Sequence, residues 1–306
     1  MTAIAILLAM GVGIAMSFQS PTNASLGLNV GAMQASLISF TGGFLALLII
    51  SLIVGGGDFG AALGVPTWQL LGGIYGAAVV FSVALSSPRL GISLTLALLM
   101  LGQMLGGIVV DSFGLFMADQ IPISPLRVLG CIAVLGGIIC VCAGGMASGG
   151  GLASEAPAQI VGCGVLSFVA GLGSAVQLPT NSALAISTGT FEASTISFGG
   201  GVIVLLVLTL LFNKGRFNSL KGTKPWQITG GLYGAYGVSA NVVATPILGV
   251  GLAMAACMFS QIIGAMAVDS LGLLRTRKVK INRYRIVGAA LLLAGVALVA
   301  AAKAIA

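Results

Sequence analysis

Apolar runs of about 20 residues recur along the whole chain, separated by short polar or glycine-rich breaks. One such run is long enough to cross the ~30 Å hydrocarbon core of a bilayer as a helix. Lipid offers the backbone no hydrogen bonds, so only helices or closed barrels can cross it. The runs lack the period of two that barrel strands show, and they therefore predict membrane-spanning helices. The expected spans are 2–20, 31–54, 67–86, 91–116, 126–144, 159–176, 189–212, 225–245, 249–274 and 284–304.

The polar breaks reveal an internal duplication with an offset of 158 residues. The segment Gln19–Asn23 (QSPTN) returns as Gln177–Asn181 (QLPTN), and 13 of 25 positions are identical between 19–43 and 177–201. The offset holds through the Trp-Gln-x-x-Gly-Gly-x-Tyr-Gly-Ala motifs that begin at Trp68 and Trp226. The expected units are a first repeat at 1–145, a flexible linker at 146–158 and a second repeat at 159–306. Five spans in each repeat, an odd number, place the repeats in opposite orientations as an inverted-topology pair.

Composition narrows the class further. Only 6% of the residues are charged, whereas soluble proteins carry about 25%, so the lipid bilayer is the expected environment. The net charge of +7 comes from basic residues in the breaks between runs, and it indicates topology and not a nucleic-acid partner. Arg89 and the stretches 214–224 and 275–285 put 11 of the 13 basic residues on one face. The positive-inside rule makes that face cytoplasmic and both termini periplasmic.

Catalytic and metal chemistry have little support in this sequence. There is no histidine, and the five cysteines lie inside apolar runs without metal-ligand spacing. No pair of acids or nucleophile–base arrangement stands out. We therefore expect no metal, no cofactor and no enzymatic activity.

Further motifs, most of them present in both repeats, are Pro21-Thr22-Asn23, Trp68 with Gly72-Gly73, Gly102-Gln103, Asp111 to Leu115 and Arg127 to Gly130. In these motifs the sequence resembles the YdcZ-type inner-membrane exporters of the drug/metabolite transporter superfamily, in a fused two-domain form. The resemblance implies a small-solute exporter in a bacterial inner (plasma) membrane, with helices 1, 3, 4, 6, 8 and 9 lining the cavity. We expect the chain to work as a monomer. Ser260 departs from the pattern, because the family has glycine before the glutamine.

Two repeated pairs are candidates for binding the solute. Gln103 and Gln261 occupy the centre of the fourth span of each repeat, where an amide is costly unless it bonds across helices or contacts a solute. Tyr75 and Tyr233 lie near the middle of the third spans, where they either pack in the core or present a hydroxyl. We expect the two glutamines to meet in a central cavity flanked by the tyrosines.

Further candidates lie around the prolines and at positions where the repeats differ. Gln19, Asn23, Gln177 and Asn181 belong either to a broken helix that binds solute or to a polar cap and loop at a helix end. Asn241 occupies the position that Val83 holds in the first repeat, and it is a substrate-binding candidate. Glu192, where the first repeat has Gln34, is a candidate for coupling, although a carboxylate at a helix start also suits the helix dipole.

Two ion pairs are expected from the duplication. Asp111 and Asp269 each end a fourth span, and Arg127 and Arg285 follow each of them by 16 residues. We therefore expect the structural salt bridges Asp111–Arg127 and Asp269–Arg285 at partly dry interfaces.

These observations favour alternating-access transport of a small neutral or amphipathic solute. A channel would need a continuous polar lining, and a scaffold or regulatory protein would not need glutamine and tyrosine pairs repeated at mid-membrane depth.

Overall fold

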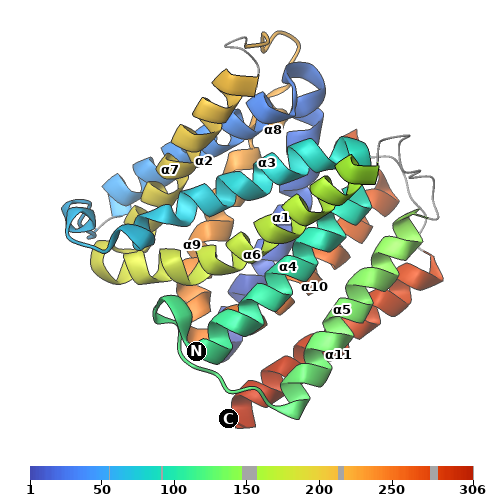
Figure 1. Cartoon of the computed structure of the whole chain (residues 1–306). Helices are drawn as coiled ribbons and strands as arrows, with labels where there is room; N and C mark the ends of the chain where they lie inside the picture. Colours follow the sequence, from blue (N-terminus) through green and yellow to red (C-terminus); the bar gives the residue numbers. More distant parts are fainter. Residues whose placement is uncertain (55, 91, 147–156, 213–216, 276–281, 306) are drawn as a thin grey trace.

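The computed structural model describes residues 1–54, 56–90, 92–146, 157–212, 217–275 and 282–305, and every regular element in these ranges is a helix. Figure 1 shows them as one bundle, with α5 and α11 at its edge. The first half contains α1 (Thr2–Val30), α2 (Ala32–Val54), η1 (Gly60–Leu63), η2 (Thr67–Leu71), α3 (Gly72–Leu90), α4 (Ile92–Phe113), η3 (Leu115–Met117) and α5 (Pro125–Met146). The second half contains α6 (Pro157–Thr188), α7 (Thr190–Phe212), α8 (Pro225–Ile228), α9 (Gly230–Leu248), α10 (Val250–Leu271), η4 (Leu273–Arg275) and α11 (Arg283–Ile305).

The outer surface of the bundle is apolar. Six helices in the described ranges, α1, α2, α6, α7, α10 and α11, are long and apolar enough to cross a membrane by length and composition. Large aliphatic side chains such as Leu52, Ile53 and Leu211 point outward and are more than two-thirds exposed. A surface of this kind fits lipid and not water.

The first helix of each half runs through its proline, and this corrects two predicted boundaries. The spans 2–20 and 159–176 were expected to end before the prolines, but α1 continues through Pro21 to Val30 and α6 continues through Pro179 to Thr188. The segments 19–23 and 177–181 are therefore neither helix breaks nor loops. A proline removes one backbone N–H and crowds the preceding turn, and here tertiary packing outweighs that cost.

Glycines mark the true ends of these two helices. Gly31 has φ +88° and its N–H bonds the carbonyl of Gly27, and Gly189 has φ +101° and bonds Ala185 in the same way. Glycine adopts this backbone region without the steric cost that other residues meet, so it allows a sharp turn into the next helix.

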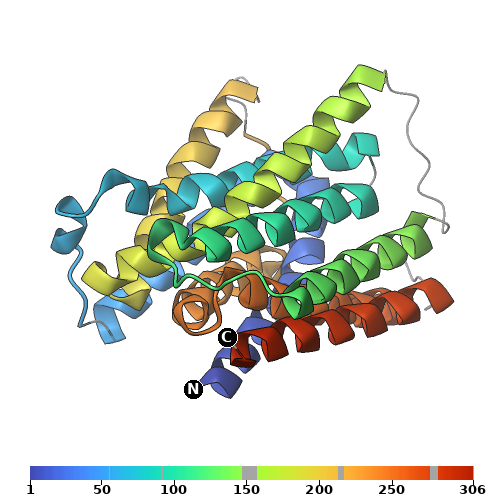
Figure 2. The ribbon, with the colours of Figure 1, turned by 60° about the horizontal axis from the view of Figure 1, so that its bottom comes forward.

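Equivalent helices of the two halves run antiparallel where they pack together, as an inverted repeat requires. A Cβ on Gly130 of α5 would meet Gly295 and Val299 of α11, whereas one on Gly137 would meet Gly288 and Leu292. The contact thus moves backward along α11 as it moves forward along α5. Figures 1 and 2 both show these two helices side by side.

The halves also exchange their first helices. α1 packs against α9 and α10 of the second half, and α6 packs against α3 and α4 of the first. The α4–α6 crossing brings Gly102 and Gly171 so close that a Cβ on either would collide with the facing backbone. Small residues permit this approach, which is common between membrane helices.

Candidate solute-binding cavity

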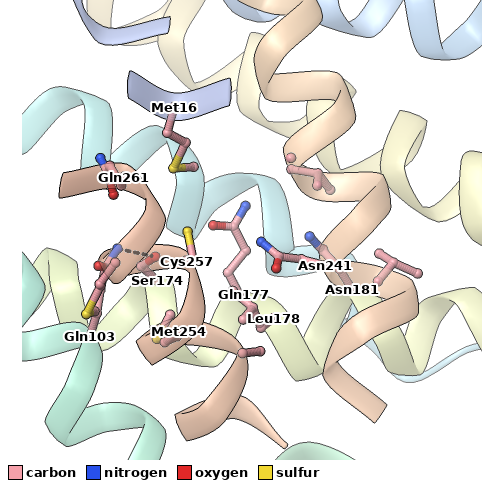
Figure 3. A pocket seen from close by; sticks show the side chains of 15 residues that line it. Met16, Gln103, Ser174, Gln177, Leu178, Asn181, Asn241, Met254, Cys257 and Gln261 are labelled. Atoms are coloured by element: carbon pink, nitrogen blue, oxygen red, sulfur yellow. Dashed lines mark hydrogen bonds between the residues drawn. The ribbon is translucent and has the colours of Figure 1, made fainter. Parts of the chain in front are cut away.

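A cavity of about 80 Å³ lies where the two exchanged first helices meet the helices of the opposite half. Figure 3 shows carboxamide groups on both sides of it and sulfur-bearing side chains between them. The lining residues are Met16 from α1, Gln103 from α4, Ser174, Gln177, Leu178 and Asn181 from α6, Gly237, Val238, Asn241 and Val242 from α9, and Ala253, Met254, Cys257, Met258 and Gln261 from α10.

Gln103 and Gln261, from opposite halves, both line this cavity, but their surroundings differ. The Nε2 of Gln103 donates a hydrogen bond of 2.9 Å to the Oγ of Ser174. The position equivalent to Ser174 in the first half is Met16, whose thioether is only a weak acceptor. Gln261 therefore lacks the matching hydrogen bond, and its amide remains available to bond a molecule in the cavity.

Three more carboxamides line the cavity from α6 and α9: Gln177, Asn181 and Asn241. The Oδ1 atoms of Asn181 and Asn241 are buried and have no hydrogen-bond partner among the described residues. The Asn181 oxygen packs against Gly72, just as the Asn23 oxygen, which is also unpaired among the described residues, packs against Gly230. Nearly all buried polar atoms in proteins are paired, so the unpaired Asn241 oxygen at this cavity needs an explanation. In Figure 3 the amide of Gln177 lies beside that of Asn241.

None of the lining residues carries a formal charge. The remaining wall is aliphatic or sulfur-bearing, with the thioethers of Met16, Met254 and Met258 and the thiol of Cys257. Methionine is flexible and polarizable, so it adapts to ligands of irregular shape. Within the described part of the chain, no three His, Cys, Asp or Glu side chains gather as metal ligands would.

Four other residues that the sequence made candidates do not line the cavity: Tyr75, Tyr233, Gln19 and Asn23. The ring of Tyr233 stacks on Phe18 with centroids 6.2 Å apart, and Tyr75 lies against Gly173. Gln19 and Asn23 lie against Gly234 and Gly230 of α9. The cavity is therefore asymmetric, because Gln177 and Asn181 line it and their first-half equivalents do not.

The same glycine contacts explain why two repeated motifs occur together. Asn181 packs on Gly72 and Gln177 on Gly76, just as Asn23 packs on Gly230 and Gln19 on Gly234. The Gln-x-Pro-Thr-Asn segment of each half thus fits the Gly-Gly-x-Tyr-Gly segment of the other half. The asparagine oxygens lie where a glycine Cβ would be, so no larger residue fits there.

Glu192 lies away from the cavity, in the first turn of α7, and is only 3% exposed. Its carboxylate packs against Gly57 and Gly189. Gln34, the equivalent residue in α2, instead pairs with the backbone of Asn218: its Nε2 donates to the carbonyl at 2.8 Å and its Oε1 accepts from the N–H at 2.7 Å. Gln34 therefore holds the segment before α8 through hydrogen bonds, whereas Glu192 packs against the segment after α2.

The expected ion pair between Asp111 and Arg127 is present and buried. The Nη2 of Arg127 lies 2.5 Å from the Oδ2 of Asp111, and the Nη1 donates to the carbonyl of Ile121. The expected Asp269–Arg285 pair cannot be compared, because the Asp269 side chain lies outside the described residues. Arg285 itself is buried, and its backbone N–H donates to the Oδ1 of Asn282.

Sequence reasoning missed Ser174 and the sulfur-bearing residues of the lining. Ser174 lies one helical turn before Gln177 on α6, so it shares a face with a residue that was already a candidate. Met16, Met254, Cys257 and Met258 carried no signal, because apolar residues in apolar helices look alike.

One comparison with known proteins identifies a family. The family described as "Putative inner membrane exporter, YdcZ" matches residues 4–140 and 163–298, once in each half. No curated protein matches the sequence. Among solved structures, 21 chains match, and one described as "Crystal structure of protein" has a TM-score of 0.74 over 99% of both chains at 16% identity, which shows a shared fold alone. Because the family match covers most of both halves, the chain belongs to this inner-membrane exporter family and is a multi-pass membrane protein.

Proposed function

We propose that this protein is a secondary transporter that exports a small, uncharged solute across a bacterial inner membrane by alternating access between its two inverted halves. The observation that carries this proposal is a cavity lined by both halves, with Gln103 from one and Gln261 from the other. In inverted-repeat transporters the solute binds at the interface between the repeats.

The absence of charge in the lining supports an uncharged solute. A cation or anion bound there would leave its charge buried without a compensating group among the lining residues. Burying an unpaired charge costs far more than burying a hydrogen-bonded neutral group.

The size of the cavity supports a conformational cycle. Pockets for drug-sized ligands are typically about 300–1,000 Å³, whereas this cavity measures about 80 Å³. The α1, α4, α6, α9 and α10 helices that enclose it would have to move apart to admit a solute. Rocking of one half against the other opens the cavity to each side in turn.

Contacts between loops support ten crossings with alternating direction. Segments that follow α2, α4, α6 and α9 contact one another, and the turn after α1 instead contacts the segment before α8. These two groups are the loops that ten alternating crossings would place on opposite faces. The contacts are Asp58 N–H to Thr188 O at 2.9 Å, Val250 N–H to Asp111 Oδ1 at 2.7 Å, and Asn218 Nδ2 to Val30 O at 2.9 Å.

Glu192 is the residue that we propose for coupling. It is a buried carboxylate that the first half replaces with an amide, at a contact between the α6–α7 turn and the segment after α2. A Glu192→Gln variant should bind solute normally but lose transport driven by an ion gradient. If gradient-driven transport persists in this variant, coupling lies elsewhere.

Counterflow in proteoliposomes tests the transport proposal. Vesicles loaded with an unlabelled solute should transiently accumulate the labelled form above its external concentration, for at least one member of a panel of small neutral metabolites. A channel would only equilibrate the label, and a scaffold would not move it. Either of these results across the panel would overturn the proposal.

A further inference from the structure

The cavity holds more hydrogen-bonding capacity than the protein uses. Of its five carboxamides, only that of Gln103 has a hydrogen bond to another described side chain, the one to Ser174. Asn241 leaves a buried oxygen without a partner, and Gln177 and Gln261 make no hydrogen bond among the described residues. A bound solute is the natural partner for these groups.

A carboxamide presents a donor and an acceptor side by side. It is best matched by a group that offers the complementary pair in one plane, so that two parallel hydrogen bonds form. Asparagine and glutamine read the edge of adenine in this way, through a bidentate pair. A lone hydroxyl satisfies only one of the two positions at a time, and a quaternary ammonium group satisfies neither.

From these groups we infer that the solute is a small uncharged molecule with an amide-like edge (a primary amide, a urea or a lactam such as a pyrimidine base), held by Asn241 and Gln177. This inference rests on the proposed transport function and names the class of solute for the same cavity. The apolar remainder of the solute contacts Met16, Met254 and Cys257, which lie between the carboxamides (Figure 3).

The differences between the repeats support a single orientation for the solute. Asn241 corresponds to Val83, and Met16 corresponds to Ser174, so the two sides of the cavity are not interchangeable. Gln177 lines the cavity, whereas its equivalent Gln19 lies outside the lining, against Gly234. The chain therefore offers matched control positions for each residue proposed to bind.

Protection of Cys257 from alkylation measures binding directly, without requiring transport. Cys257 lines the cavity, and its modification by a small maleimide can be followed by peptide mass spectrometry in the otherwise unchanged protein. Acetamide, methylurea and uracil should each slow this modification, whereas ethanol and tetramethylammonium at equal concentrations should not. Protection by ethanol or tetramethylammonium alone, or by none of the five, would overturn the inference.

Variants separate the binding groups from general packing effects. Asn241→Val installs the residue of the other half and should raise the concentration of uracil needed for protection by about 10-fold or more, which is the effect of losing roughly 1.4 kcal/mol of hydrogen bonding. Gln177→Leu should act similarly, whereas Gln19→Leu should change protection by less than about 2-fold, because Gln19 is outside the lining. Equal effects of Gln177→Leu and Gln19→Leu would contradict the inference.

The two proposals can fail separately. Counterflow of a polyol without protection by amide solutes would retain transport and reject this solute class. Protection by amide solutes without counterflow of any solute would retain the binding class and reject transport.

Discussion

The carboxylate of Asp111 accepts a hydrogen bond from the backbone N–H of Val250 at 2.7 Å, and this contact joins the end of α4 in the first half to the start of α10 in the second. The adjacent N–H of Gly251 donates to the other carboxylate oxygen, also at 2.7 Å. A negative charge at a helix N-terminus satisfies free N–H groups and interacts favourably with the helix dipole. Asp111 thus serves at once as the ion-pair partner of Arg127 and as a cap that connects the halves.

We predict that Asp111→Asn destabilises the protein by about 3–5 kcal/mol, because Arg127 is then left as a buried charge without its counter-ion. Thermal unfolding in detergent measures the change. Asp119→Asn is the matched control, since this carboxylate is exposed in the same connection and should change the stability by less than about 0.5 kcal/mol. A similar small effect at Asp111 would show that the buried pair contributes little. Asp269→Asn should behave like Asp111→Asn if the duplicated pair with Arg285 forms.

The contacts between asparagine and glycine give a second prediction. Gly72→Ala and Gly230→Ala each place a methyl group on the amide oxygen of Asn181 or Asn23, and each should cost about 1–3 kcal/mol of stability through overpacking. Nothing lies within 4 Å of a Cβ at Gly162 of α6, so Gly162→Ala should be neutral or stabilising by up to about 1 kcal/mol. Thermal unfolding of the three variants compares them. Tolerance of alanine at Gly72 and Gly230 would show that the contact relaxes without cost.

The features that could be predicted from sequence are those that depend on composition and repetition. Apolar runs led to helices, and the constant offset between repeated motifs led to an inverted arrangement that the antiparallel α5–α11 packing supports. The spacing of Asp111 and Arg127 led to an ion pair, because 16 residues can turn the chain back at the end of a helix.

The features that escaped prediction depend on contacts between the halves. Helix α1 continues through Pro21 because Gln19 and Asn23 pack on glycines of α9, and no local sequence signal reports such a long-range contact. The asymmetry of the cavity comes from positions where the repeats differ, such as Ser174 opposite Met16. A search for repeated residues passes over such differences.

Topology gives a third prediction. The basic residues of 217–224 and 282–285 flank the ends of α8 and α11, and their concentration on one face should make that face cytoplasmic. A Thr2→Cys variant should therefore react with a membrane-impermeant maleimide in intact cells, whereas Lys221→Cys should react only after the cells are opened. Labelling of Lys221→Cys in intact cells would reverse the assigned orientation, and labelling of both positions would indicate dual insertion.

The hydrogen bond between Gln103 and Ser174 makes the two central glutamines distinguishable by experiment. Gln103→Leu removes this bond and leaves the buried Ser174 hydroxyl without its Gln103 partner, so it should lower the stability by about 1 kcal/mol. Gln261→Leu removes no hydrogen bond to a described residue and should leave thermal unfolding near that of the wild type. If both amides hold solute, each variant should lose counterflow despite this difference in stability. Gln19→Leu, which changes an amide outside the cavity lining, controls for the general effect of the substitution. Full transport by Gln261→Leu would remove this residue from the binding site, and normal transport by both variants would limit the pair to helix packing.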